Sequence, residues 1–210
     1  MNIPKIYKDK DASLEYLKSK KVGIIGFGNQ GKAQALNLRD SGINVQVGGR
    51  LDGISLDVAK GLGFKINSIP DIVKVSDVIV LLVPDQIMGE IFKVDICPYL
   101  ETDQSLIFSH GYNIHYKLIS SPSYVNVIMA APSGAGAELR NRYKKKSGIP
   151  GLFAVHQDFS KDSRKLALSY CKGIGLTRIG VIESTFKEET ETDLFGEQVV
   201  LTGGIPKLLQ

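Results

Sequence analysis

Three glycines near the amino end of the sequence have the spacing of a loop that binds a dinucleotide pyrophosphate. Residues 26–31 read G-x-G-x-x-G, follow a short apolar run and open a stretch whose apolar residues have helical spacing. There the glycines permit a tight turn, close approach of the pyrophosphate and close packing of helix on strand, and the helix amino terminus attracts phosphates. The cofactor-binding residues that we expect in this loop are Gly26, Phe27, Gly28, Asn29, Gln30 and Gly31.

The residues after the second expected strand bear on the choice between NADP and NAD. A chain that binds NAD usually carries Asp or Glu at this position, to bind the ribose hydroxyls, whereas this sequence has Arg50. The Arg50 guanidinium can pair with a 2′-phosphate, and Ser55 can donate a further hydrogen bond to it. Asp52 and Asp57 lie nearby and would favour NAD. The pattern therefore favours NADP, with NAD as the alternative.

A parallel sheet is needed to position these residues, and the sequence has the alternation that builds one. Strands are expected at residues 22–26, 45–48, 65–66, 78–83, 105–108, 125–129, 152–155 and 177–182. Helices are expected from about residue 30 and at 55–62, 70–75, 86–92, 160–172 and 185–201, the last closed by Gly203 and Gly204. Such alternation implies right-handed crossovers. We expect an α/β fold of the Rossmann type, with a doubly wound, mainly parallel sheet and helices on both faces.

Composition indicates a globular protein and gives no sign of a nucleic-acid partner. Of the 210 residues, 43% are hydrophobic and 23% charged, as in ordinary globular domains. The net charge of +4 is modest, and the one basic run, residues 144–146, is expected in a solvated loop. Cys97 and Cys171 fit neither a disulfide framework nor a metal site, and the apolar run 78–83 is too short to span a membrane. We therefore expect a soluble, cytoplasmic protein.

Three segments resemble ketol-acid reductoisomerase, and they occur in the order found in that family. Residues 26–40 read GFGNQGKAQALNLRD, residues 109–115 read SHGYNIH and residues 185–198 read TFKEETETDLFGEQ. The resemblance extends from roughly residue 5 to residue 204 and concerns the family's amino-terminal NADP-binding domain. It implies a dinucleotide-binding domain at residues 1–204 and a short tail at 205–210, where the family's helical, knotted domain would begin.

The resemblance also implies an activity and its residues. The family uses NADPH and Mg²⁺ to convert 2-acetolactate or 2-aceto-2-hydroxybutyrate into a dihydroxy acid, by alkyl migration and reduction, during valine and isoleucine synthesis. It implies that His110 is catalytic and that Asp193 and Glu197 bind Mg²⁺. Their four-residue spacing places both carboxylates on one helix face. The other acidic residues of this helix are assigned to its solvated face: Glu188, Glu189 and Glu191.

One segment departs from the family pattern. The family reads Ala-Pro-Lys-x-Pro-Gly where residues 131–136 read APSGAG, so that Ser133 replaces the active-site lysine. A neutral hydroxyl cannot stabilise a developing alkoxide as an ammonium group does. Gly136 ends the segment, and we expect it to contact the cofactor.

Two functions of different classes follow from these observations. The first is an NADP-dependent enzyme of the ketol-acid reductoisomerase type, acting on a small-molecule substrate as a homo-oligomer or with a helical-domain partner. The second is a catalytically degenerate NADP-binding module, or an incomplete subunit that needs such a partner. Other dehydrogenases, such as 3-hydroxy acid or imine reductases, share the glycine loop but not the segments around His110 and Asp193. An exposed apolar patch is expected at Leu194, Phe195, Val199 and Leu201.

Overall fold

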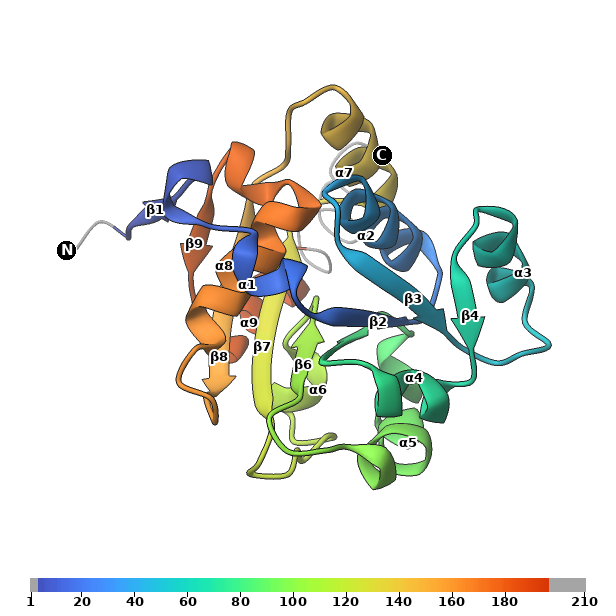
Figure 1. The fold of residues 1–210 in the computed structure, drawn as a ribbon. Coiled ribbons are helices and arrows are strands. Elements are labelled where there is room, and N and C mark those ends of the chain that lie inside the picture. The colour runs from blue at the N-terminus through green and yellow to red at the C-terminus, as the bar shows by residue number, and fades with distance from the viewer. Residues whose placement is uncertain (1–3, 197–210) are drawn as a thin grey trace, which may run out of the picture.

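The computed structural model describes residues 4–196, which form a nine-stranded sheet with helices on both faces (Figure 1). The strands are β1 Ile6–Tyr7, β2 Lys21–Ile25, β3 Asn44–Gly48, β4 Lys65–Asn67, β5 Val78–Leu81, β6 Ser105–Phe108, β7 Asn126–Pro132, β8 Gly151–Gln157 and β9 Val181–Glu183. The α-helices are α1 Glu15–Lys18, α2 Asn29–Asp40, α3 Ile54–Gly61, α4 Ile69–Val75, α5 Asp85–Ile91, α6 Tyr112–His115, α7 Gly136–Lys144, α8 Ser163–Ile174 and α9 Phe186–Phe195.

The strand order confirms the expected doubly wound, mainly parallel sheet. The order is β1-β9-β8-β7-β6-β5-β2-β3-β4. Every pairing between two strands of the set β2 to β7 is parallel. The direction of winding reverses between β2 and β5, which is where open α/β sheets bind ligands, outside the carboxyl ends of their strands. Two pairings are antiparallel: β7 with β8, and β1 with β9.

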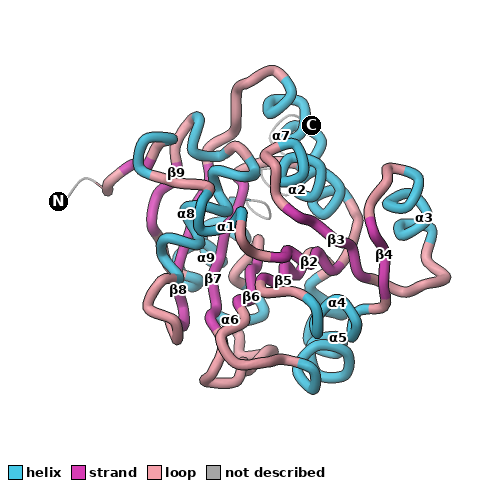
Figure 2. The backbone as a smooth tube through the Cα atoms, in the orientation of Figure 1, coloured by secondary structure: helices cyan, strands magenta, loops and turns pink. Residues whose placement is uncertain are grey.

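Alternate residues of the central strands enter two separate cores. In β5, Val78 and Val80 pack on one face of the sheet and Ile79 and Leu81 on the other. Helices α1, α2, α3, α7 and α8 contribute buried side chains to the first core, and α4, α5, α6 and α9 to the second, so helices flank the strands on both sides in Figure 2. Full burial of each aliphatic side chain stabilises the fold by about 1.5–3 kcal/mol.

Most expected elements are present, and two expectations are wrong. The strand expected at 177–182 is a 3₁₀ turn, Leu176–Arg178, followed by β9, because the chain turns at Gly175 and Gly180 with φ of 92° and 142°. Helix α7 was not anticipated, and it includes Lys144, which had been expected in a loop; Lys145 and Lys146 are exposed, as expected. The expected end of the last helix lies outside the described residues.

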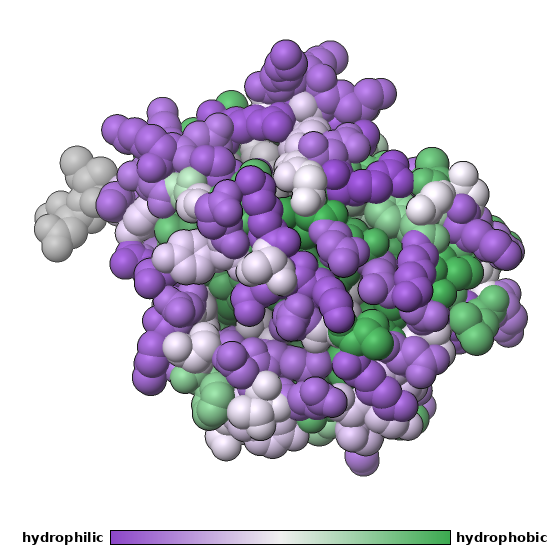
Figure 3. All heavy atoms as spheres, viewed as in Figure 1, coloured by the Kyte–Doolittle hydropathy of each residue, from purple (hydrophilic) through white to green (hydrophobic). Residues whose placement is uncertain are grey.

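The surface in the view of Figure 3 is mostly hydrophilic, and hydrophobic side chains gather toward the α3 end of the sheet. The exposed apolar residues in and beside α3 are Leu51, Ile54, Val58 and Leu62. Within residues 4–196, no helix combines the length and the apolar character needed to cross a membrane.

The two cysteines lie in different environments, which predicts different reactivities. Cys171 is fully buried in α8, and burial raises the pKa of its thiol to about 12, whereas Cys97 is partly exposed. Because the thiolate is the reactive form, we expect a disulfide reagent at about pH 8 to modify Cys97 rapidly in the native chain and Cys171 only after unfolding. Peptide mapping of the labelled protein checks this, and equal native rates would contradict the burial of Cys171.

Candidate functional site

The loop after β2 requires glycine at two of its three expected positions. Gly26 has φ of +96°, its N–H donates to the Gly48 carbonyl at 3.0 Å, and a Cβ on it would lie 2.6 Å from the Leu82 carbonyl oxygen. A Cβ on Gly31 would lie 2.1 Å from the Gly26 carbonyl oxygen. These glycines therefore let the strand, the turn and the first turn of α2 approach one another closely.

Gly28 is different, because no protein atom requires the absence of its side chain. It is the N-cap of α2 with φ of −76°, and a Cβ added there meets nothing within 4 Å. The first intrahelical bond runs from the Lys32 N–H to the Gly28 carbonyl at 2.9 Å, so the N–H groups at the start of α2 have no partner within the helix. The open space and the free donors fit the pyrophosphate of a dinucleotide.

The amino terminus of α7 lies against the same loop. A Cβ on Gly136 would lie 2.2 Å from the Asn29 carbonyl oxygen, so close packing by itself accounts for the glycine. The Gln30 Nε2 donates to the Gly134 carbonyl at 2.9 Å and joins the start of α2 to the turn before α7. Two helix amino termini therefore adjoin each other here. The contact of Gly136 with a cofactor stays a prediction.

Arg50 and Ser55 lie beyond the carboxyl end of β3, in the loop before α3 and in its first turn. Both are exposed, and since β3 is the parallel neighbour of β2, they share the sheet edge with the glycine loop. Leu51 and Ile54 beside them are 65% and 83% exposed. A cation, a hydroxyl and apolar surface are thus available at this end of the edge.

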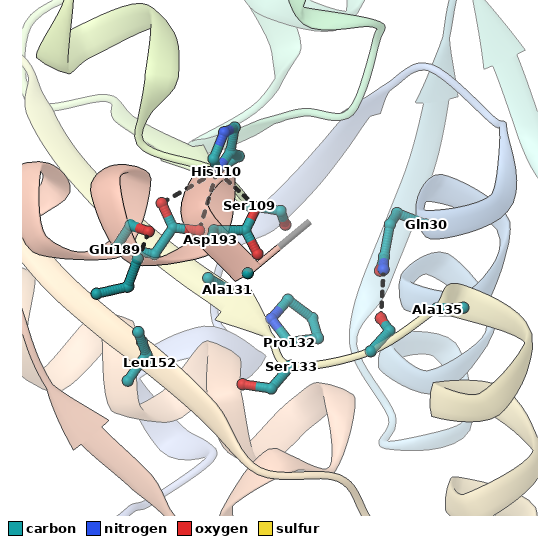
Figure 4. A pocket seen from close by; sticks show the side chains of 13 residues that line it. Gln30, Ser109, His110, Ala131, Pro132, Ser133, Ala135, Leu152, Glu189 and Asp193 are labelled. Carbon is teal, nitrogen blue, oxygen red and sulfur yellow. Dashed lines mark hydrogen bonds and ion pairs between the residues drawn. The ribbon is translucent and has the colours of Figure 1, made fainter. Parts of the chain in front are cut away.

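His110 follows β6 and contacts two carboxylates of α9. Its Nδ1 lies 3.0 and 3.1 Å from the two carboxylate oxygens of Glu189 and 3.6 Å from the Asp193 Oδ2. Figure 4 draws these three side chains and the contacts between them. Glu189 is only 5% exposed and also accepts a hydrogen bond from the Gly111 N–H at 2.8 Å. The prediction that Glu189 belongs to a solvated helix face is therefore wrong.

The close approach of α9 to the loop after β6 explains this error. A Cβ on Gly111 would lie 2.4 Å from the Phe186 carbonyl oxygen and 2.5 Å from the Thr190 Oγ1, so only glycine admits the helix. Glu188 and Glu191 are exposed, as predicted. A glycine directly after the expected catalytic histidine was the available signal, but the sequence does not say which helix packs on it.

Electrostatic interactions in this cluster favour a protonated imidazole. Burial alone lowers the pKa of His110, but the hydrogen bond and charge of Glu189, with the charges of Asp85 and Asp193, outweigh it and raise the pKa. Asp85, after β5, was not anticipated as a site residue. The pKa of Asp85 is also raised, because the effect of burial is larger than the opposing effects of His110 and of the 2.9 Å hydrogen bond from the Asn113 Nδ2.

Two cavities meet at His110 and Asp193, which line both of them. The first, of about 670 Å³, extends from Gln30 past Ser109 and Ser133 to Glu189 (Figure 4). The second, of about 710 Å³, lies on the other side of the histidine; its lining includes Asp85, Gln86, Tyr112, Asn113 and Leu118. Each has the size of an ordinary small-molecule site.

The carboxylates beside the cavities are suited to a divalent cation. Ligand atoms of His110, Glu189 and Asp193 lie within 4.8 Å of one another, and carboxylate oxygens with water are the ligands that Mg²⁺ prefers. The Asp193 side chain is 49% exposed, whereas Glu189 already binds His110 and Gly111. Asp193 is therefore the better candidate for metal binding. Glu197 lies outside the described residues.

Ser133 lies in the first cavity, as the sequence pattern suggested. Its N–H donates to the Pro150 carbonyl at 3.0 Å, which holds the turn after β7. Among the described residues that line this cavity, none is Lys or Arg. Positive potential from the lining would therefore come from His110 when it is protonated and from the adjoining helix amino termini.

Comparison with known proteins identifies the family. The sequence matches the family described as acetohydroxy acid isomeroreductase, NADPH-binding domain, over residues 16–180. The chain belongs to the ketol-acid reductoisomerase family. The NADP(+) ketol-acid reductoisomerases of Methanocaldococcus jannaschii and Sulfurisphaera tokodaii are 48% and 50% identical over 206 residues, 98% of this chain. The chain spans 62% of the length of each of these relatives.

Solved structures agree with this assignment. An NADH-preferring ketol-acid reductoisomerase from an uncultured archean superposes with a TM-score of 0.95 at 41% identity, covering 98% of this chain and 63% of that one. A 3-hydroxyisobutyrate dehydrogenase from Mycobacterium tuberculosis has a TM-score of 0.65 at 16% identity, covering 87% and 60%. That second likeness shows a common fold alone. The alternative drawn from hydroxy acid dehydrogenases thus has support only at the level of fold.

Proposed function

We propose that this chain forms the nucleotide-binding and metal-binding half of a ketol-acid reductoisomerase, converting 2-acetolactate or 2-aceto-2-hydroxybutyrate in branched-chain amino acid synthesis. One observation carries the proposal. A single cavity joins Gln30, on the glycine-loop helix, to the cluster of His110, Glu189 and Asp193 (Figure 4). A dinucleotide bound at the loop would therefore reach a site with a proton donor and a metal ligand.

The strand order supports one orientation for the cofactor. Arg50 and Ser55 follow β3, on one side of the glycine loop, whereas His110 follows β6, on the other. The adenosine half would lie toward Arg50, with the 2′-phosphate on its guanidinium, and the nicotinamide half toward His110. When bound, NADPH would supply the hydride and Mg²⁺ the Lewis acidity.

The chain's own residues would bind, orient and move a proton. Glu189 contacts the Nδ1 of His110 and raises the pKa of the imidazole, which favours the protonated form and suits donation of a proton to a developing alkoxide of the substrate. Asp193 would bind the cation from the exposed side of the cavity, and Glu197, four residues later, would add a second carboxylate. Gly28 would keep the loop open to the pyrophosphate, and Gly136, packed against Asn29, would bring the amino terminus of α7 to the same phosphates.

A further chain segment or a second copy would complete the site. Leu118, which lines the second cavity, is 55% exposed. Three more exposed apolar residues adjoin lining residues, in sequence or by ring contact: Ile87 at 46%, Tyr116 at 49% and Phe195 at 61%. Phe195 is thus exposed as the sequence suggested, whereas Leu194 is partly buried and lines this cavity, and Val199 and Leu201 lie outside the described residues. The relatives are longer than this chain, and a helical segment in their additional length would cover this surface. Two free thiols suit a reducing cytoplasm.

Cofactor choice is the first test of the proposal. Calorimetric titration should show tighter binding of NADPH than of NADH, and Arg50→Ala should weaken NADPH binding about tenfold while NADH binding stays unchanged, because a charge-assisted hydrogen bond is lost. Lys60→Ala, at the far end of α3, is the matched basic control. Undetectable binding of both nucleotides would refute the proposal, and an unchanged NADPH affinity in Arg50→Ala would refute the placement of the 2′-phosphate.

Ser133 favours a second candidate, an NADP-binding module without turnover. None of the described residues lining the cavity supplies a lysine or arginine, so stabilisation of an alkoxide is weak. NADPH oxidation with 2-acetolactate and Mg²⁺ separates the two candidates, with Ser133→Lys measured beside the natural chain. Turnover by the natural chain supports the enzyme. If the natural chain binds NADPH without turnover and Ser133→Lys restores turnover, the result supports the module.

A further inference from the structure

A chain of hydrogen bonds lies directly behind the first cavity and is centred on Gln34 of α2. The Gln34 side chain is fully buried. Its Nε2 donates to the Ser109 Oγ at 3.0 Å and to the Gln30 Oε1 at 3.1 Å, and its Oε1 accepts from the Tyr170 hydroxyl of α8 at 2.6 Å. A buried amide with all these partners fixes its own orientation.

The donors in this chain all point the same way, from Tyr170 toward the cavity. Ser109 Oγ donates onward to the Ala130 carbonyl at 3.1 Å, and Gln30 Nε2 donates onward to the Gly134 carbonyl at 2.9 Å. Burial raises the pKa of Tyr170 well above its ordinary value, so the phenol keeps its proton. A reversed Gln34 amide would turn its oxygen toward the Gln30 Oε1, and Gln30 would then have to release Gly134.

The outer members of the chain line the cavity, whereas the inner members do not. Gln30, Ser109 and Gly134 are lining residues, and they come from α2, the end of β6 and the turn after β7. Gln34 and Tyr170 lie behind them and contribute no lining. These hydrogen bonds therefore join the glycine-loop helix to Ser109, the residue before His110, and to the turn that contains Ser133. Figure 4 draws the outer members Gln30 and Ser109.

We propose that Gln34 is a positioning residue for the nicotinamide half of the bound dinucleotide, acting through Gln30 and Ser109. This inference rests on the proposed function, since it requires a dinucleotide in the cavity. The adenosine half would lie on the other side of β2, beyond β3, where Gln34 makes none of its hydrogen bonds. Fixing the lining groups before binding lowers the ordering cost of the ligand that contacts them.

A purely structural role for Gln34 would give a different result, because it would affect every ligand alike. The experiment therefore compares NADPH with 2′,5′-ADP, which has the adenosine half and lacks the nicotinamide half. Gln34→Met removes the central amide of the hydrogen-bond chain and keeps a similar side-chain volume. It also leaves the buried Tyr170 hydroxyl without its acceptor, which destabilises the fold. The double variant Gln34→Met with Tyr170→Phe removes both polar groups together and is expected to recover most of that stability.

Calorimetric titration of the whole chain, beside thermal unfolding, gives the readout. In the double variant we expect NADPH affinity to fall about three- to tenfold, the size expected for lost positioning hydrogen bonds, while 2′,5′-ADP affinity stays as in the natural chain. Tyr170→Phe alone keeps the bonds to Gln30 and Ser109 and should have the smaller effect on NADPH. Unchanged NADPH affinity in a folded double variant, or an equal loss for both ligands, would overturn the inference. A natural chain that binds neither ligand would overturn the proposed function, and this inference with it.

Discussion

Gly28→Ala is expected to leave the folded chain as stable as before while weakening NADPH binding more than tenfold. The added methyl group meets no protein atom within 4 Å, and φ of −76° suits alanine. The unfolded chain loses entropy, which favours folding by about 0.4–1 kcal/mol, but alanine is a poorer N-cap than glycine, so the free energy of unfolding should stay close to that of the natural chain. The methyl group would occupy the space through which a pyrophosphate approaches the backbone. Urea denaturation and calorimetric titration measure the two effects.

Gly31→Ala is the matched comparison within the same loop. Its Cβ would lie 2.1 Å from the Gly26 carbonyl oxygen, so we expect a loss of about 1–3 kcal/mol in the free energy of unfolding, the range for overpacked sites. Binding should weaken as a consequence of the shifted loop. If Gly28→Ala binds NADPH like the natural chain, the phosphates do not pass over Gly28 and the assigned loop is wrong.

Glu189→Gln is expected to lower the pKa of His110 with little change in packing. Glutamine keeps the size of the side chain and one oxygen for the Gly111 N–H, but it removes the charge that opposes the effect of burial on the imidazole. Glu189→Ala would instead leave that buried N–H without an acceptor, at a cost of about 1–3 kcal/mol. Titration of the His110 ring resonances by NMR, in the presence of a chelator, measures the pKa.

Stability should follow pH in the direction set by this interaction. In the folded chain the pKa of His110 is raised above 6.5, the ordinary value for a histidine side chain. Its protonation therefore contributes stability that is fully present below pH 6.5 and is lost as the pH rises through the folded pKa. The natural chain should therefore lose stability with rising pH across this window, and Glu189→Gln should lose less. Denaturation at a series of pH values, with metal removed, measures the difference.

The neighbouring residue provides the control for both measurements. Glu188 is exposed and accepts a hydrogen bond from the Ser184 Oγ at 2.8 Å, away from the histidine. Glu188→Gln removes the same charge from the same helix, and the His110 pKa should stay near that of the natural chain. An equal shift in the two variants would mean that general charge, and not the buried contact, sets the protonation of His110.

The strand, turn and helix around residues 21–40 could be predicted from the sequence alone because each depends on local patterns. Apolar periodicity marked β2 and α2, and the spacing of Gly26 and Gly31 matches a turn whose backbone geometry only glycine permits. The run of buried strands likewise required a mainly parallel sheet. The resemblance to a known family then supplied His110 and Asp193. The structure places the His110 Nδ1 3.6 Å from the Asp193 Oδ2.

Glu189 shows what local pattern cannot supply. On α9 it has the same side-chain type as exposed Glu188, and only the packing of Gly111, from a segment 78 residues earlier, makes it buried and bound. Gln34 is comparable, because its partners Ser109 and Tyr170 lie 75 and 136 residues away. Sequence by itself determined most of the elements and the glycine loop, since these follow from short-range periodicity and backbone sterics. The tertiary structure alone decided which polar side chains are desolvated and paired, because burial depends on which distant segments pack together.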